Sequence, residues 1–232
     1  MGRLVSVDPE NSAPIRPGTC YLGSENALVA DLLADRSILD SDADKAQTIE
    51  LPGQWQPLVL YGPSGSGKSH LSLRIAERWE SDLTVAVTTA ADISRLFQPS
   101  QMPAFDNEAA KFRNVELLII DDIDHLSDLA SDWLIGLLDH RNLLALATVV
   151  TVKSLASLRG LPLRLASRLL AGLPIRCALP EAATRRTIIR DAMSRVPNQT
   201  SLTNTNQDSL PAIETLVRES AGLSVAAIWN LV

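Results

Sequence analysis

The sequence predicts an α/β fold, in which a parallel five-stranded sheet is sandwiched by helices and a small helical unit follows at the C-terminal end. Short apolar runs of strand length alternate with helical apolar spacing along most of the chain. Strands buried on both faces of a parallel sheet are continuously apolar, as Leu117 to Ile120 are in the expected strand that begins at Glu116. Hydrophobic residues make up 46% of the 232 residues, which is enough for a substantial core.

The strands and helices can be placed in order along the chain. A first helix is expected over residues 23–34, with Ser24 as its N-cap. The expected strands cover residues 57–61, 83–88, 116–120, 144–152 and 175–179. Helices are expected over residues 70–79, 90–97, 108–113, 127–140, 163–171 and 181–196. Pro99 and Pro103 predict a loop between the third and fourth helices.

The composition divides the chain into three segments. Residues 1–18 contain three prolines and are expected to form an extended leader. Residues 19–197 carry the alternating pattern and form the main α/β domain. After residue 197 the chain becomes rich in Asn, Gln, Thr and Ser before two helical stretches, so residues 198–232 are expected to form a small helical subdomain.

Charge and hydropathy exclude some classes of protein. The net charge of −6 argues against a body that coats duplex DNA by bulk electrostatics. The longest apolar runs are far shorter than the roughly 20 residues of a membrane span, and the N-terminus has no apolar signal segment. Cys20 and Cys177 lie far apart, without metal-ligand spacing. A cytoplasmic location is therefore expected.

A phosphate-binding loop follows the first predicted strand. Its residues are Gly62, Pro63, Ser64, Gly65, Ser66, Gly67, Lys68 and Ser69, which match the P-loop pattern between a strand and a helix. Glycines let backbone N–H groups turn towards phosphates, and the helix N-terminus adds positive potential. Lys68 is expected to contact the β- and γ-phosphates and Ser69 to bind Mg²⁺. The loop predicts binding of ATP or ADP.

Two acidic residues end the third predicted strand. Asp121 and Asp122 follow an apolar run, at the sheet edge where ligands of open α/β folds bind. Asp121 is expected to hold Mg²⁺ through its water shell, and Asp122 to polarise the attacking water. The alternative is that the pair caps the helix that begins near Ser127.

Histidines do not predict a metal site. His125 and His140 have no ligand spacing, and each is expected to be structural or exposed. His70 directly follows Ser69 and is counted with the loop among the residues expected next to the nucleotide.

Three segments together resemble the AAA+ domain of the bacterial replication initiator family, DnaA. They are Leu58–Leu73, Leu117–Leu126 and Leu163–Leu173, and the last contains the family-specific Arg-Leu-x-Ser-Arg piece followed by Gly-Leu. The resemblance covers about residues 20–232 and implies a P-loop AAA+ fold with a C-terminal helical lid. It also implies an ATP-dependent oligomer, in which Arg168 acts as an arginine finger on the γ-phosphate of a neighbouring subunit. The segment Tyr21–Asn26 resembles the family's adenine-side motif, so Tyr21 and Leu22 are expected beside the nucleotide.

Two positions depart from the family's pattern. The fourth strand ends in Thr151-Val152-Lys153, where the family has Thr-Ser-Asp, so that Thr151 is the remaining sensor candidate. The lid stretch Gly222–Trp229 lacks the arginine that the family places against the nucleotide. Both departures weaken the expectation of hydrolysis more than that of nucleotide binding.

Several functions share this core. The resemblance implies an ATPase that acts in, or controls, initiation of chromosomal replication, with itself, a related initiator, origin DNA or single-stranded DNA as partner. The alternatives are a low-turnover regulator like the short relative Hda and a helicase-loader ATPase. The chain stops in the lid without a DNA-reading domain, which is expected of a trimmed initiator or of the short relatives. Residues 47–52 only faintly resemble the relatives' clamp-binding peptide. A small-molecule kinase is disfavoured because no acceptor-site motif is present.

Overall fold

The computed structural model describes residues 21–33, 57–98, 102–194 and 209–231. The predicted leader (1–18) and the faint clamp-binding motif (47–52) lie outside the described residues. None of the helices within these ranges is long and apolar enough to cross a membrane.

The predicted fold class is confirmed, because the five strands form one parallel sheet. The strands are β1 (Leu58–Tyr61), β2 (Val85–Thr89), β3 (Leu117–Asp121), β4 (Ala147–Val152) and β5 (Leu173–Arg176). Their order in the sheet is β2-β3-β4-β1-β5. The carboxyl ends of β1, β3 and β4 therefore lie side by side at one edge of the sheet.

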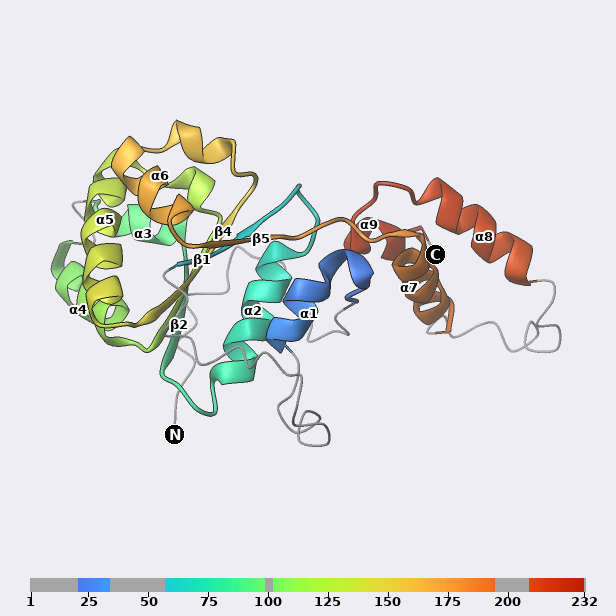
Figure 1. Ribbon diagram of the computed structural model, residues 1–232, viewed down its shortest axis with the longest axis horizontal. Helices are drawn as coiled ribbons and strands as arrows, with labels where there is room; N and C mark the ends of the chain where they lie inside the picture. Colours follow the sequence, from blue (N-terminus) through green and yellow to red (C-terminus); the bar gives the residue numbers. More distant parts are fainter. Residues whose placement is uncertain (1–20, 34–56, 99–101, 195–208, 232) are drawn as a thin grey trace.

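Helices cover both faces of the sheet because successive strand residues point to opposite sides. On one face pack α3 (Ala90–Leu96), α4 (Met102–Asn114), α5 (Asp128–Leu143) and α6 (Leu163–Leu170). The other face is covered by α1 (Ala27–Leu33) and α2 (Lys68–Trp79). In β3, Leu118 and Ile120 join the first core, whereas Leu117 and Ile119 join the second. Figure 1 shows the sheet between the two helix layers.

A third hydrophobic core belongs to the C-terminal helices. It joins α7 (Ala182–Ser194), α8 (Ser209–Glu219) and α9 (Val225–Trp229) around Ile188, Ile213 and Ile228. These helices stand apart from the sheet layers in Figure 1. The domain boundary at residues 197 and 198 stays a prediction, and the packing of α7 with α8 and α9 leads us to propose a boundary nearer Pro180.

Several boundaries differ from the sequence-based ones for identifiable reasons. Helix α4 begins at Met102 instead of 108, because a proline in the first turn of a helix costs no hydrogen bond. Strand β4 begins at Ala147 instead of 144, after a turn in which Ala145 has a φ of 54°. Ser24 is not an N-cap: it begins a short 3₁₀ turn (Ser24–Asn26), which Gly23 precedes without a side-chain cap.

The last strand also shifts, from the expected 175–179 to Leu173–Arg176. Beyond this strand, the side chain of Asn26 forms hydrogen bonds with the backbone of Ala178. The buried Asn26 accepts a hydrogen bond from the Ala178 N–H at 2.8 Å and donates its amide to the Ala178 carbonyl at 3.2 Å. The segment of the predicted adenine-side motif is thereby fastened to the chain that leaves β5.

Candidate nucleotide-binding site

The P-loop connects β1 to α2 and has the backbone that its glycines predict. Gly65 and Gly67 adopt φ values of 78° and 88°, in the left-handed region that favours glycine. Gly67 is the N-cap residue of α2. At Gly62 a Cβ atom would lie 2.0 Å from the Cys177 carbonyl oxygen, so this position needs glycine for a different reason, close backbone approach. The loop is therefore held between α2 and the segment after β5.

The polar groups of the loop suit an anion. The Lys68 ammonium donates hydrogen bonds to the carbonyls of Gly62 (2.8 Å) and Pro63 (3.0 Å), so its charge lies over the loop. The Ser66 hydroxyl is buried and has no hydrogen-bond partner among the described residues. The first N–H groups of an α-helix also have no partner inside the helix. Unpaired donors around a lysine fit a polyphosphate chain.

The acidic pair lies at the same edge of the sheet as the P-loop. Asp121 ends β3, and its carboxylate accepts a hydrogen bond from the Thr151 hydroxyl on β4. The same hydroxyl accepts a hydrogen bond from the Asp122 N–H at 2.8 Å. Strand β4 separates β3 from β1 in the sheet, so Thr151 lies between the acids and the loop. The structure thus gives the predicted sensor residue Thr151 a direct contact with Asp121.

Asp122 has an unusual backbone and an exposed side chain. Its φ is 58°, which is uncommon outside glycine, and the residue precedes a short 3₁₀ turn over Ile123–His125. Its carboxylate is 56% exposed and lies 3.3 Å from the Nε2 atom of His125. The helix that follows is capped by the Ser127 hydroxyl, not by either aspartate. The alternative reading of the pair as a helix cap is therefore wrong, and the metal and water-polarising roles stay predictions.

Ser69 and Asp121 supply the kind of oxygen ligands that Mg²⁺ takes. A hydroxyl and a carboxylate, with phosphate oxygens and water, are the donors that this ion prefers. Among the described residues there is no group of three or more His, Cys, Asp or Glu side chains that could hold a metal ion.

Two of the expected adenine-side residues contact different cores, Leu22 the second and Tyr21 the third. The Tyr21 hydroxyl donates a hydrogen bond to Asp191 on α7, and the Tyr21 ring centroid lies 6.5 Å from that of Trp229 on α9. Leu22 packs against the core formed by α1 and α2. His70 is half-buried in the first turn of α2, and this burial, aided by Arg74, lowers its pKa. Contacts of these three residues with a nucleotide stay predictions.

The lid touches the P-loop at a residue that the site prediction missed. A Cβ atom on Gly65 would lie 2.4 Å from the Cβ of Ser224. Ser224 is the N-cap of α9, and its hydroxyl accepts the Ala227 N–H at 3.1 Å. A serine before a Val-Ala-Ala run is an N-cap signal that the sequence carries. The contact with Gly65 is not visible there.

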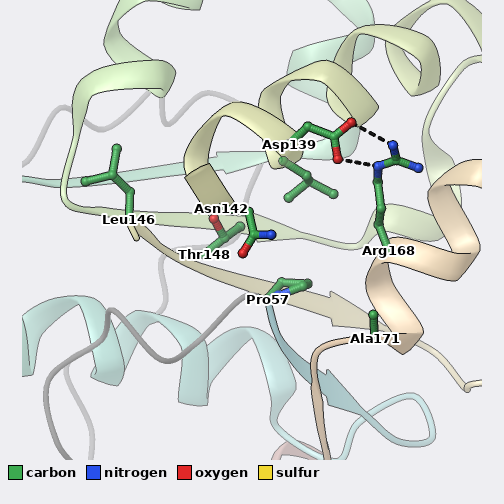
Figure 2. A pocket seen from close by; sticks show the side chains of 8 residues that line it. Pro57, Asp139, Asn142, Leu146, Thr148, Arg168 and Ala171 are labelled. Carbon is green, nitrogen blue, oxygen red and sulfur yellow. Dashed lines mark hydrogen bonds and ion pairs between the residues drawn. The ribbon is translucent and has the colours of Figure 1, made fainter. Parts of the chain in front are cut away.

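Arg168 lies at the opposite edge of the sheet from its own P-loop. It lines a pocket with Pro57, which precedes β1, and with Leu146 and Thr148 at the start of β4 (Figure 2). The P-loop instead follows the carboxyl end of β1, which is about 13 Å long at 3.3 Å a residue. The structure therefore brings Lys68, Asp121 and Asp122 to one edge and leaves Arg168 at the other.

Comparisons with known proteins agree with this fold. Residues 57–169 match the AAA domain (dynein-related subfamily). The chromosomal replication initiator protein DnaA of Sphingopyxis alaskensis is 28% identical over 203 residues, which are 82% of this chain and 44% of the relative. DnaA of Oenococcus oeni is 29% identical over 207 residues, with the same two shares. The chain spans less than half the length of these curated relatives.

Solved structures of DnaA share the fold. Domain III of the Thermotoga maritima replication initiation protein DnaA has a TM-score of 0.68 at 20% identity, covering 91% of this chain and 82% of that one. A replication initiator DnaA bound to AMPPCP and single-stranded DNA has a TM-score of 0.69 at 18% identity, covering 91% and 61%. Residues 57–169 thus match an AAA domain, and the chain is similar in sequence to the DnaA replication initiators and has the fold of DnaA domain III.

Proposed function

We propose that this protein binds ATP, assembles into nucleotide-dependent oligomers and acts in, or regulates, the initiation of chromosomal DNA replication in the cytoplasm. The observation that carries the proposal is the division of the site between two sheet edges. The P-loop and Asp121 occupy the carboxyl edge, whereas Arg168 occupies the amino edge. Arg168 can then contact a phosphate bound to a second copy that is stacked head to tail, but not a phosphate bound to its own loop.

Each residue has a defined task in this proposal. The loop N–H groups and Lys68 bind the phosphates, and Arg168 of the neighbouring copy neutralises charge on the γ-phosphate. Ser69 and Asp121 would hold Mg²⁺, which supplies further positive charge to the phosphates when bound. Asp122 would accept a hydrogen bond from water near the γ-phosphate. Thr151 keeps Asp121 in place through its hydroxyl.

Nucleotide binding is the first test. Titration of a fluorescent ATP analogue should give saturable binding to the wild-type chain, and Lys68→Ala should weaken it roughly 30- to 100-fold, the loss of a charge-assisted contact. Arg74→Ala is the matched control, because it removes an exposed cation of the same helix that forms an ion pair with Glu77. Equal affinities for wild type and Lys68→Ala would contradict the proposed role of the loop.

Assembly is the second test. Sedimentation velocity should show larger species with Mg²⁺ and a non-hydrolysable ATP analogue than with ADP, and Arg168→Ala should remove them. Arg159→Ala, a basic residue before α6, is the control. One solved DnaA is bound to single-stranded DNA, so a labelled single strand should also bind more tightly with the ATP analogue than with ADP. A single size under all nucleotide conditions would contradict the oligomer.

A low-turnover regulator is the second candidate function. It is favoured by Lys153, which stands where the family has an aspartate and whose backbone N–H donates to Asp124 at 2.6 Å. It is also favoured by α9, which has no arginine where the family places one against the nucleotide. Steady-state phosphate release separates the two: release above background that is lost in Lys68→Ala supports the ATPase. Background release together with tight nucleotide binding supports the regulator.

A further inference from the structure

The Arg168 guanidinium is engaged inside its own subunit. Its Nε and Nη2 atoms donate to the two carboxylate oxygens of Asp139 at 2.5 and 2.6 Å, as a two-pronged ion pair (Figure 2). Its Nη1 atom donates to the Arg164 carbonyl at 3.0 Å. Asp139 lies near the end of α5 and Arg168 near the end of α6, so the pair joins two neighbouring helices.

The two N–H groups that bind Asp139 are also the groups with which an arginine recognises phosphate. Two parallel N–H groups match two oxygens of a carboxylate or of a phosphate equally well. While Asp139 accepts hydrogen bonds from these N–H groups, its negative charge also lies beside any phosphate that approaches the guanidinium. Like charges repel. Asp139 therefore competes with a phosphate for Arg168 instead of assisting it.

The ion pair between Arg168 and Asp139 is accessible to solvent and can therefore dissociate. Both side chains are accessible, with exposed fractions of 28% for Arg168 and 53% for Asp139. The hydrogen bond with Arg168, with Arg164 nearby, holds the pKa of Asp139 below its usual value, so the carboxylate stays charged at neutral pH. Exposed ion pairs are weak because water screens them. A triphosphate carries more charge than one carboxylate and can displace it.

We propose that Asp139 is a latch that holds Arg168 within the free subunit and releases it only when a nucleotide-loaded neighbour presents its phosphates. This inference rests on the proposed oligomer and adds its regulation. The latch raises the protein concentration at which subunits assemble. It also favours a neighbour loaded with the more highly charged triphosphate, because a less charged ligand competes poorly with Asp139.

The test compares variants of Asp139 in the full chain. Asp139→Ala removes the latch, and Asp139→Asn keeps its shape without its charge. Asp132→Ala is the matched control, because Asp132 is an exposed acid on the same helix and forms no ion pair within the part of the chain that the structure describes. Sedimentation velocity with Mg²⁺ and a non-hydrolysable ATP analogue gives the protein concentration at half-assembly. Affinity of the isolated subunit for the same analogue is measured alongside.

The latch predicts half-assembly at a protein concentration about two- to fivefold lower in Asp139→Ala, with a smaller decrease in Asp139→Asn and no change in Asp132→Ala. Nucleotide affinity of the subunit stays unchanged, because the pair lies at the other sheet edge. The double variant Asp139→Ala, Arg168→Ala assembles no better than Arg168→Ala.

Two results overturn the latch, and they differ in what they say of the oligomer. If Asp139→Ala assembles at the wild-type concentration or a higher one while Arg168→Ala loses assembly, Asp139 supports Arg168 and the oligomer stands. If no variant assembles with the ATP analogue, the oligomer and the latch fall together. Assembly of Asp139→Ala where wild type stays monomeric supports both.

Discussion

The Thr151 hydroxyl bridges two consecutive residues of the neighbouring strand end: it donates to the Asp121 carboxylate and accepts the Asp122 N–H. A hydroxyl has one hydrogen to donate. The direction of both bonds is therefore set, and Asp121 is held as an acceptor beside the P-loop edge.

Thr151→Val should weaken Mg²⁺-dependent nucleotide binding roughly tenfold, because groups that orient a metal-binding carboxylate typically contribute about 10- to 100-fold. Valine has the same shape but leaves the Asp122 N–H without its partner. Titration of an ATP analogue at several Mg²⁺ concentrations measures the effect. Thr151→Ser keeps the hydroxyl and should bind nearly as wild type does. An unchanged Mg²⁺ dependence in Thr151→Val would show that Asp121 needs no support.

Gly65→Ala should weaken nucleotide binding and displace the lid. The substitution places a methyl group 2.4 Å from the Ser224 Cβ and forces alanine to a φ of 78°, which costs about 1–2 kcal/mol in the left-handed region alone. Gly67→Ala has similar backbone strain but no contact within 4 Å, so the difference between the two isolates the contact with the lid. Gly136→Ala in α5 is the control and should leave binding unchanged.

A second substitution tests whether the contact with Ser224 causes the weaker binding. Ser224→Gly removes the atom that the new methyl group would meet, so the double variant Gly65→Ala, Ser224→Gly should bind nucleotide more tightly than Gly65→Ala alone. Isothermal titration with an ATP analogue measures both. Equal affinities for these two variants would mean that the lid contact contributes nothing.

Arg141→Ala should destabilise the protein by roughly 3–5 kcal/mol, the cost of breaking a buried charged network. Arg141 is 1% exposed, and burial lowers its pKa to about 10, which leaves it charged at neutral pH. Its guanidinium donates to the Thr148 hydroxyl and to four backbone carbonyls, those of Phe112, Val115, Glu116 and Ala147. Without it these carbonyls lose a donor that joins α4, β3 and β4.

Urea unfolding followed by tryptophan fluorescence measures the change in the free energy of unfolding. Arg186→Ala, which removes an exposed pair with Glu214, should change it by less than about 1 kcal/mol. Arg141→Lys should recover part of the loss, because lysine restores the charge without the planar fork. A loss below about 1 kcal/mol in Arg141→Ala would show that water replaces the guanidinium.

Cys177 predicts a loss of stability at alkaline pH. Burial raises the pKa of its thiol from 9.0 to about 11. The folded chain therefore holds this proton where the unfolded chain releases it, and stability falls as pH rises from about 9 to about 11. The full effect of such a shift is about 2–3 kcal/mol. Urea unfolding at pH 8, 9, 10 and 11 should give a steeper fall in wild type than in Cys177→Ala. Parallel curves would contradict the shift.

The sequence by itself determined the fold class and the P-loop, because both depend on local order. Short, continuous apolar runs such as Leu117–Ile120 indicate buried strands by their length and composition, and the loop pattern lies between one strand and one helix. Element ends were less predictable. The turn at Ala145 and the proline within α4 depend on which backbone groups the surrounding structure leaves paired.

Only the tertiary structure decided which distant residues meet. The pairing of Asn26 with Ala178, of Thr151 with Asp121 and of Asp139 with Arg168 follows from strand register and helix packing across many intervening residues. A linear pattern carries no such information. Most consequential is the position of Arg168: the sequence marked it as a finger, whereas the sheet places it at the edge opposite its own P-loop. Parallel strands separate their two ends by their full length, and this separation keeps Arg168 away from its own P-loop and beside Asp139.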